Sequence, residues 1–355
     1  MQDTTFESTA IVAGAGAIGI VLGARLFRDG VPVEIFTKPP DHAALANSAG
    51  IVAEGIGGRV EARPKVVSDA SRLTPQPDVV FLAMKAIHIR AALDELAPVL
   101  GPRTTVVVMQ NGYCEDIVAE IVGRERVVSC TVKWGASLLG PTRSIRTSHG
   151  GFVLGTLDGD DEHSSPALRS VAGMLRPSWP VLVTPNVVGI RHAKLIFNAC
   201  ATTLGAVCGL NLRGVLSSRA GRTAFLTTAT EGIDVFQAMG IKLEPLDRLP
   251  MTLLHTGHAR RDGGFSFPLL VAELVVRLIA WRRGTILSSM LQSMRRGEPP
   301  EIEYLNGYIV RKGAAAGVPT PFNARLVDVV EQIARGERDV TPRNLPRLFT
   351  SGYLA

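Results

Sequence analysis

The chain has 355 residues, a length that favours two domains over one. Hydrophobic residues make up 46% of it and charged residues 20%, a composition that excludes wholesale disorder. The formal net charge of +6 comes from scattered Lys and Arg residues, and only 5% of residues are aromatic. Nucleic-acid binding therefore has weak support, and this mild basic excess equally suits a small anionic ligand.

Cysteine usage and hydropathy favour a cytoplasmic protein. The four cysteines have neither CxxC spacing nor a His at metal-ligand spacing, so we expect reduced thiols and no metal site. Residues 1–9 are polar and acidic, unlike a signal peptide. The longest apolar stretch, 267–281, contains Glu273 and Arg277 and is shorter than the ~20 residues of a membrane span. We expect a buried helix there, and no membrane partner.

The first half of the chain alternates short β-branched runs with helical patterns. Strands are expected at 10–13, 33–36, 79–83 and 104–109, and helices at 17–29 and 89–100. The continuous apolar runs among these strands are typical of a parallel sheet buried on both faces. Residues 127–154 carry strand and Gly signals with little helix. This alternation predicts a doubly wound α/β domain.

From residue 187 onward the pattern is helical. Helices are expected at 187–204, 222–239, 267–281, 301–315 and 322–334. The composition changes near residues 180–185, which predicts an α/β domain at 1–185 and an all-α domain at 186–340. Residues 341–355 form a tail, and we expect the Arg- and Pro-rich chain after Gly336 to be poorly ordered.

A glycine-rich turn joins the first expected strand to the first expected helix. Its GxGxxG motif consists of Gly14, Ala15, Gly16, Ala17, Ile18 and Gly19. Gly14 permits the tight turn, Gly16 lets the backbone approach a pyrophosphate, and Gly19 allows close packing of helix and strand. Amides at the helix N-terminus then face the phosphates, so the motif predicts a dinucleotide site. The alternative is a glycine-rich turn with no ligand.

The end of the second expected strand bears on the choice of cofactor. In NAD sites this strand usually ends with Asp or Glu, which bonds the ribose 2′-hydroxyl. Here it ends Phe36-Thr37-Lys38, and the next carboxylate is Asp41. A hydroxyl and a cation suit a 2′-phosphate, so the sequence favours NADP. The alternative for Lys38 is an ordinary solvated lysine.

Three polar residues recur every four positions in the apolar helix expected at 187–204. Lys194, Asn198 and Thr202 therefore lie along one ridge. Partial burial of such a lysine lowers the pKa of its ammonium group toward the range of a proton donor. The alternative is a ridge in water, with Lys194 a surface residue. Because clefts between domains commonly hold ligands, the two-domain setting favours a functional role.

A second polar cluster comprises Ser-Ser-Met at 288–290 and Glu-Ile-Glu-Tyr-Leu-Asn-Gly at 301–307. Pro299 and Pro300 precede the helix expected at 301–315 and place Glu301 in its first turn. Glu301 is then either a charge that stabilises the helix N-terminus or a carboxylate that reaches Lys194 or the substrate.

These motifs together resemble the ketopantoate reductase (2-dehydropantoate 2-reductase) family, over about residues 10–326. The glycine turn is similar to the family's nucleotide loop, and Lys38 falls where the family has a basic residue for the 2′-phosphate. Met84-Lys85-Ala86 resembles its strand-end lysine motif, and Gln110-Asn111-Gly112 resembles its QNG motif. The Lys194-x-x-x-Asn198 pattern resembles its catalytic helix. The cluster at 288–307 resembles its closing signature.

The resemblance implies a Rossmann-type domain followed by a helical domain, and NADPH-dependent reduction of a 2-keto acid. The most direct reaction is ketopantoate to pantoate, in pantothenate biosynthesis. Lys194 would be the general acid, with Glu301 positioning it or bonding the substrate. Substrate-binding roles would fall to Asn198, Thr202, Ser289 and Asn111. Lys85 and Asn111 would lie near the cofactor, and a homodimer is compatible with the resemblance.

Three departures from the family pattern bear on the substrate. Thr202 stands where the family often has Asn, and a shorter side chain without an amide changes what the ridge can hold. Lys133-Trp134-Gly135 replaces a small or His-containing segment, where Trp134 either narrows the cleft or simply packs. Residues 251–284 are longer than the family's usual connection, with a loop expected at 260–264. These features suggest a paralogue whose keto acid differs from ketopantoate.

Two other functions stay open. One is a different dehydrogenase with a Rossmann and a helical domain, of the opine or 3-hydroxyacid type. The other is a non-catalytic NADP-sensing protein, which would keep residues 14–19 but have no use for Lys194 and Glu301.

Overall fold

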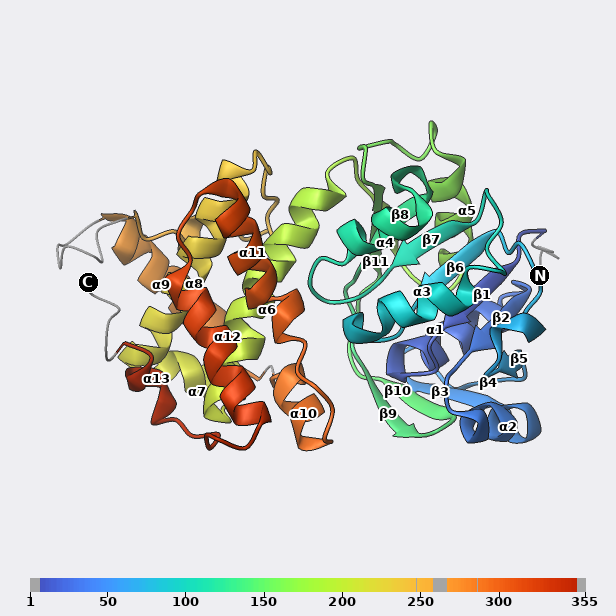
Figure 1. Cartoon of the computed structure of the whole chain (residues 1–355), viewed down its shortest axis with the longest axis horizontal. Coiled ribbons are helices and arrows are strands. Elements are labelled where there is room, and N and C mark those ends of the chain that lie inside the picture. Colours follow the sequence, from blue (N-terminus) through green and yellow to red (C-terminus); the bar gives the residue numbers. More distant parts are fainter. Residues whose placement is uncertain (1–6, 247, 258–266, 286, 350–355) are drawn as a thin grey trace. The chain divides into compact units, whose positions relative to one another are not determined.

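The computed structural model describes residues 7–246, 248–257, 267–285 and 287–349 (Figure 1). The loop expected at 260–264 lies outside these residues. The chain forms two compact units, one of residues 1–110 and 114–187 and the other of residues 111–113 and 188–355. A sheet with mainly parallel strands dominates the first unit and helices make up the second, which confirms the predicted fold class.

The main sheet of the first unit has eight strands in the order β12-β11-β8-β7-β6-β1-β2-β5. Their bounds are β1 Ala10–Ala13, β2 Val33–Phe36, β5 Lys65–Val67, β6 Val79–Leu82, β7 Thr105–Val108, β8 Val127–Val132, β11 Phe152–Thr156 and β12 Val181–Val183. The strands from β5 to β8 all pair in parallel. Taken in chain order, these six strands have the 3-2-1-4-5-6 arrangement of dinucleotide-binding domains. All four residues of β1, β6 and β7 are buried, as expected for a sheet covered on both faces.

A second, four-stranded sheet in this unit was not predicted from the sequence. Its order is β4-β3-β10-β9, with β3 at Ile51–Gly55, β4 at Val60–Ala62, β9 at Ala136–Gly140 and β10 at Arg143–Arg146. Helix α1 packs against this sheet, and the Ser144 hydroxyl of β10 donates to the Ala17 carbonyl at 2.8 Å. The second sheet therefore supports the first turn of α1. The unit's helices are α1 Ala17–Arg28, α2 Pro40–Ala49, α3 Ile89–Leu96, α4 Glu115–Val122 and α5 Pro166–Leu175.

Trp134 resolves one alternative left open by the sequence, because it packs in the core of the first unit. Its ring stacks on Trp179 with centroids 5.8 Å apart and meets Phe152 edge-on. The residue is 5% exposed. The tryptophan is therefore part of the packing of this unit.

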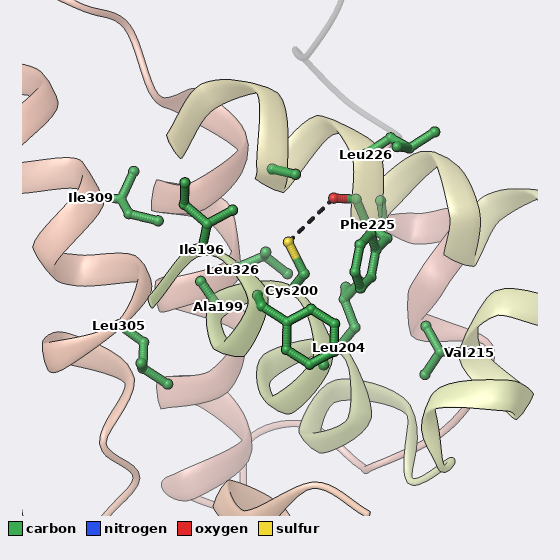
Figure 2. Close-up of a cluster of buried hydrophobic side chains, with 14 of the residues drawn as sticks. Ile196, Ala199, Cys200, Leu204, Val215, Phe225, Leu226, Leu305, Ile309 and Leu326 are labelled. Carbon is green, nitrogen blue, oxygen red and sulfur yellow. Dashed lines mark hydrogen bonds between the residues drawn. The ribbon is translucent and has the colours of Figure 1, made fainter. Parts of the chain in front are cut away.

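The second unit is a helical bundle built around α6 (Figure 1). Its helices are α6 Val187–Cys208, α7 Leu212–Ser217, α8 Arg219–Ala238, α9 Phe267–Arg283, α10 Ser289–Arg295, α11 Asn306–Ala316, α12 Pro321–Ala334 and α13 Asn344–Arg347. Figure 2 shows the buried face of α6, where Ile196, Cys200 and Leu204 pack among apolar side chains of neighbouring helices. Burial raises the pKa of the Cys200 thiol, which donates to the Phe225 carbonyl at 3.4 Å. This cysteine is a packing residue.

Two expectations for the second unit are wrong. Helix α9 is not buried all round, because one of its faces is exposed and carries large apolar side chains. The chain after Gly336 is ordered as far as Phe349, since Leu345 and Leu348 are buried and Phe349 stacks on Phe322. Of the tail, only residues 350–355 lie outside the described part.

Within the described residues, no helix is long and apolar enough to cross a membrane.

Candidate functional site

The glycine turn is fixed where three strands of the main sheet end. The Gly14 amide donates to the Phe36 carbonyl of β2 at 2.8 Å, and Gly14 has a φ of +115°. A Cβ at this position would lie 2.7 Å from the amide nitrogen of Met84, which follows β6. Only glycine allows this conformation and this approach together.

The other two glycines of the motif have opposite surroundings. A Cβ on Gly19 would lie 1.8 Å from the Gly14 carbonyl oxygen, so this position is closed to any side chain. A Cβ on Gly16 would meet nothing within 4 Å. Gly16 is the N-cap of α1, and it is exposed, while Ala17 and Ile18 form the first turn. The turn and Ala15 thus leave open backbone at a helix N-terminus, which fits the phosphates of a dinucleotide.

Lys38 lies two residues beyond β2 and has a carboxylate partner. Its ammonium group forms an ion pair with Glu95 of α3, and the Lys38 side chain is 63% exposed. Thr37 is buried, and its amide donates to the Val67 carbonyl of β5 at 2.9 Å. Of the two residues predicted to meet a 2′-phosphate, Lys38 alone is well exposed.

Lys85 and Gln110 lie at the ends of adjacent parallel strands. Lys85 is half-buried and follows β6, where it precedes a short 3-10 helix at Ala86–His88. The Gln110 side-chain amide donates to the carbonyl oxygens of Leu82 at 2.8 Å and Met84 at 3.0 Å. Gln110 therefore ties the end of β7 to the end of β6. The sequence reasoning assigned no role to Gln110, although it stands first in the QNG motif.

Residues 111–113 belong to the second unit although β7, which precedes them, belongs to the first. Gly112 has a φ of +82°, and a Cβ there would lie 2.3 Å from the Tyr304 carbonyl oxygen. The Tyr113 ring lies 4.2 Å from the His192 ring of α6, centroid to centroid. These two contacts hold the neighbouring Asn111 against the helical unit.

The polar ridge of α6 is the one strip of its C-terminal part that reaches the surface. From Arg191 to Cys208, every residue is buried except Lys194, Asn198 and Thr202, which are half-buried. The structure thus places these three side chains on one face, with partial solvent contact. Lys194 is therefore neither fully buried nor fully exposed, and its functional role stays a prediction.

A small cavity in the second unit collects all four predicted substrate-binding residues. It is lined by Asn111, Asn198, Thr202, Ser289, Met290, Glu301 and Leu305. The Asn198 side-chain amide donates to the Asn111 side-chain oxygen at 3.5 Å. Lys194 lies one helical turn before Asn198 and is not among the lining residues. The volume of about 10 Å³ is near the minimum that admits one water molecule, so this cavity alone does not enclose a larger ligand.

Ser288 is a structural residue of the site that the sequence reasoning passed over in favour of Ser289. It is buried, and its hydroxyl donates to the Thr202 carbonyl at 2.6 Å. The same oxygen accepts from the Leu291 amide at 3.0 Å and caps α10. Ser288 thereby fixes α10 to α6, with Ser289 exposed beside the cavity. A serine directly before a short helix is the signal that indicates this cap.

The predicted helical position of Glu301 is wrong. Glu301 is the N-cap of a 3-10 helix at Ile302–Tyr304, and α11 begins only at Asn306. The two prolines before it end the preceding loop but do not start an α-helix. Glu301 therefore reaches the cavity from a turn.

Asn306 connects the helices behind the cavity and was not singled out from the sequence. It is fully buried, and its side-chain oxygen accepts from the Thr203 hydroxyl at 2.6 Å. Its amide nitrogen donates to the Asn323 side-chain oxygen at 2.9 Å and to the Ala199 carbonyl at 3.3 Å. Thr203 and Ala199 are the neighbours of Thr202 and Asn198 on α6, so Asn306 supports the ridge from its buried side.

Metal-ligand clusters were sought throughout the part of the chain that the structure describes. There, no group of three or more His, Cys, Asp or Glu side chains is arranged to hold a metal ion.

Two family models match the chain, both described as ketopantoate reductase PanE/ApbA. The first matches residues 10–159, and the second, for the C-terminal part, matches residues 186–334. Among relatives, the 2-dehydropantoate 2-reductase of Archaeoglobus fulgidus is 26% identical over 92% of this chain and 97% of its own. That of Lactococcus lactis is 21% identical over 90% of this chain and 96% of its own.

Solved structures show the same architecture. A PanE/ApbA family ketopantoate reductase from Ralstonia eutropha superposes with a TM-score of 0.77 at 25% identity, covering 93% of this chain and all of that one. A D-mandelate dehydrogenase with NADH and anilino(oxo)acetate also has a TM-score of 0.77, at 23% identity, over 92% of this chain and 99% of that one. At that identity, the likeness to the mandelate enzyme concerns the fold alone.

The fold and these matches define the class of the chain as an oxidoreductase that acts on CH–OH groups. The chain belongs to the ketopantoate reductase family, whose two models together match most of its length.

Proposed function

We propose that this chain reduces a small 2-keto acid to the 2-hydroxy acid with NADPH. The observation that carries the proposal is the ridge of Lys194, Asn198 and Thr202, the only residues between Arg191 and Cys208 that are not buried. A helix otherwise enclosed in the core keeps an ammonium group, an amide and a hydroxyl in one row. Such a row suits a ligand with a carbonyl and a carboxylate.

The cofactor would bind to the first unit. The open backbone at Gly16 and the N-terminus of α1 would hold the pyrophosphate, with Gly14 and Gly19 shaping the turn. Lys38 would meet the 2′-phosphate of NADPH, and Lys85 would contact the cofactor near the end of β6. When bound, the reduced nicotinamide supplies the hydride. The mandelate enzyme of the same fold has NADH, which makes NADH the competing cofactor to test.

Lys194 would act as the general acid. Its ammonium group would stabilise the negative charge that develops on the keto oxygen and then donate a proton to it. Its half-buried position keeps part of the bulk water away from this charge, which strengthens the interaction. Glu301 would orient the ammonium group or accept a hydrogen bond from the substrate.

The cavity residues would bind and orient the keto acid. Asn198 and Asn111 face each other at 3.5 Å, a distance at which both amides can turn toward a bound oxygen atom. Ser289 would donate its hydroxyl to the substrate carboxylate, and Thr202 would contact the substrate side chain. Alignment by such groups is the main contribution of a protein to hydride transfer.

Ketopantoate is the first candidate substrate, because the relatives from Archaeoglobus fulgidus and Lactococcus lactis are named 2-dehydropantoate 2-reductases. A different 2-keto acid is the second candidate, and Thr202 favours it, since a threonine replaces the amide expected at that ridge position. Reduction of ketopantoate would place the protein in pantothenate biosynthesis, in the cytoplasm.

The test is a panel of 2-keto acids that includes ketopantoate, followed by the loss of NADPH absorbance and by product analysis. We expect turnover with at least one 2-keto acid and loss of most of it in Lys194→Ala. The matched variant Lys194→Arg keeps a cation but is a poor proton donor, so it should bind substrate while its kcat falls. Equal activity in the wild type and Lys194→Ala would remove Lys194 from the mechanism. Formation of an opine or a 3-hydroxy acid would show that the chain is a different type of dehydrogenase, and would contradict the proposed reaction.

A further inference from the structure

Lys133 follows strand β8 at the carboxyl edge of the main sheet, the edge that also carries the glycine turn. One row of paired residues across β1, β6, β7 and β8 consists of Ala13, Leu82, Val108 and Ser129. Strand β7 ends at this row, whereas β8 continues to Val132, which pairs with Phe152 of β11. Lys133 therefore stands four residues, or about 13 Å, beyond the row along the strand direction.

The backbone around Lys133 is held on both sides. The Lys133 amide donates to the Gly151 carbonyl at 3.0 Å, and the Gly135 amide donates to the Ser148 hydroxyl at 2.8 Å. Between these two bonds lies the buried ring of Trp134. Lys133 is thus an exposed cation on a fixed section of chain.

Arg146 of β10 adds a second attachment for this section. Its guanidinium group lies 5.4 Å from the centre of the Trp134 ring, a cation–π contact. The same group donates to the carbonyl oxygens of Ser148 at 3.3 Å and Gly150 at 2.5 Å. Because Arg146 and Trp134 fix the chain in this way, the position of Lys133 at the edge of the sheet is built into the first unit.

The alternation of side chains along β8 gives the direction of Lys133. Cys130 and Trp134 belong to the core cluster that includes α1, so the alternation continues past the end of the strand. Ser129 points to the other face, where its hydroxyl donates to the Glu115 carboxylate of α4 at 2.5 Å. With a period of two, Lys133 leaves the chain on the same side as Ser129.

We propose that the Lys133 ammonium group binds a second carboxylate, at the far end of the substrate, so that the chain prefers 2-keto dicarboxylic acids. This inference rests on the function proposed above, in which Ser289 binds the first carboxylate of the keto acid. Ketopantoate has a neutral hydroxyl at its far end and has no use for a further cation there. Thr202 agrees with a different acid, because it lacks the amide expected at that ridge position.

The place of Lys133 in the sheet favours the substrate over the cofactor as its anionic partner. In this fold the pyrophosphate lies at the glycine turn after β1, and the adenosine half extends toward β2. Three strand spacings, or about 14 Å, separate β1 from β8, which is more than a lysine side chain spans. The nicotinamide half extends the other way, toward β6 and β7, and its ring carries no anionic group. Beside that ring, the anion for Lys133 to bind is the acid that the nicotinamide reduces.

The test compares keto acids that match in length and differ in the terminal carboxylate, namely 2-oxoglutarate with 2-oxopentanoate and oxaloacetate with 2-oxobutanoate. With NADPH as the reductant, we expect the wild-type kcat/KM to be about tenfold or more higher for the dicarboxylate of at least one pair. Lys133→Gln should lower this value about 10- to 100-fold, mainly through KM, and change the monocarboxylate value less than about threefold. Lys133→Arg should keep most of the preference because it keeps the cation.

Lys65→Gln is the matched control, because Lys65 is also an exposed lysine but begins β5, at the opposite edge of the sheet. It should leave kcat/KM unchanged for all four acids. A wild type with no preference for either dicarboxylate would overturn the proposal, as would an equal loss for both acids of a pair in Lys133→Gln. Weaker NADPH binding by Lys133→Gln in a fluorescence titration would assign the ammonium group to the cofactor instead, and would also overturn it.

Failure of the proposed function is a separate outcome, in which none of the acids is reduced. Calorimetric titration of the chain saturated with NADP⁺ then decides the present question without turnover. We expect 2-oxoglutarate to bind more tightly than 2-oxopentanoate to the wild type, and the two to bind alike to Lys133→Gln. Equal binding of the two acids to the wild type would exclude a carboxylate site at Lys133.

Discussion

The Lys38 ammonium group forms an ion pair with the Glu95 carboxylate of α3. Lys38 follows β2, whose last residue, Phe36, accepts from the Gly14 amide of the glycine turn. The cation proposed to meet the 2′-phosphate therefore has a carboxylate of its own chain beside it. The Glu95 carboxylate would compete with the 2′-phosphate for Lys38 and would also repel the phosphate. Both effects would weaken the preference for NADPH over NADH.

Replacing Glu95 should strengthen NADPH binding. Glu95→Gln removes the competing charge and keeps the size of the side chain. An exposed ion pair is worth ~0.2–1 kcal/mol, so we expect the Kd for NADPH to fall about two- to fivefold while the Kd for NADH stays constant. Fluorescence titration of both cofactors measures this difference. An equal change for the two would show that Glu95 does not face the 2′-phosphate.

Lys38→Glu is the opposite variant, and it should weaken NADPH binding about tenfold, far more than NADH binding, because a carboxylate would replace the phosphate-binding cation. A cofactor preference that does not change in Lys38→Glu would refute the assignment of Lys38 itself, whatever Glu95→Gln does.

Gly112→Ala should damage both stability and activity. The new Cβ would lie 2.3 Å from the Tyr304 carbonyl oxygen, and the φ of +82° already disfavours any side chain. We expect the free energy of unfolding to fall by about 3 kcal/mol or more and kcat/KM to fall with it, since Asn111 would shift. Gly240→Ala is the control, because Gly240 also has a positive φ but open space around it. It should cost about 1 kcal/mol and leave kcat/KM unchanged. Similar losses for the two variants would contradict the role of the Tyr304 contact.

Asn306→Ala should destabilise the second unit more than the loss of a single hydrogen bond does. The variant leaves the Thr203 hydroxyl, the Asn323 side chain and the Ala199 carbonyl without this partner. We expect the free energy of unfolding to fall by about 3 kcal/mol, as measured by urea denaturation. Thr203→Val removes one of the three bonds and should cost about 1 kcal/mol. If both variants cost the same, Asn306 does not act as the centre of this network.

Glu34 should make the first unit sensitive to acid. Burial alone would raise the pKa of the Glu34 carboxyl, but hydrogen bonds from Lys65 and from the Thr74 amide and hydroxyl outweigh it and hold the pKa below its ordinary value. A lowered pKa in the folded state stabilises the protein above the pKa of the unfolded chain, and this contribution is lost as the pH falls through the folded pKa. Glu34→Gln should therefore lower the free energy of unfolding by up to about 1 kcal/mol at neutral pH, and the two proteins should converge as the pH falls through the lowered pKa of the folded state. A difference that stays constant with pH would exclude this cause.

The sequence was sufficient where the signal is local. The spacing of Gly14, Gly16 and Gly19 indicated a strand, a turn and a helix, and the four-residue repeat of Lys194, Asn198 and Thr202 identified one face of α6. Both patterns depend on backbone geometry that neighbouring residues share.

Contacts between distant segments were beyond the sequence. Ser288 and Asn306 act on α6 from other helices, and nothing in their immediate neighbours shows which carbonyl each would meet. The exposed face of α9 was missed for a related reason, because an apolar composition shows that a helix has surface to bury but not how much of it the same chain covers. Glu301 was predicted to lie in an α-helix because prolines often precede the first turn of one. Here the same two prolines precede a 3-10 helix, and the sequence does not distinguish these two outcomes.

The attachment of residues 111–113 to the helical unit means that no single cut separates the two units. A fragment that begins at residue 188 would lack the Tyr113 ring that lies on His192 and the Gly112 backbone that lies on Tyr304. It would also lack Asn111, and with it one wall of the small cavity. The helical unit therefore includes residues 111–113, which in the sequence lie within the α/β unit.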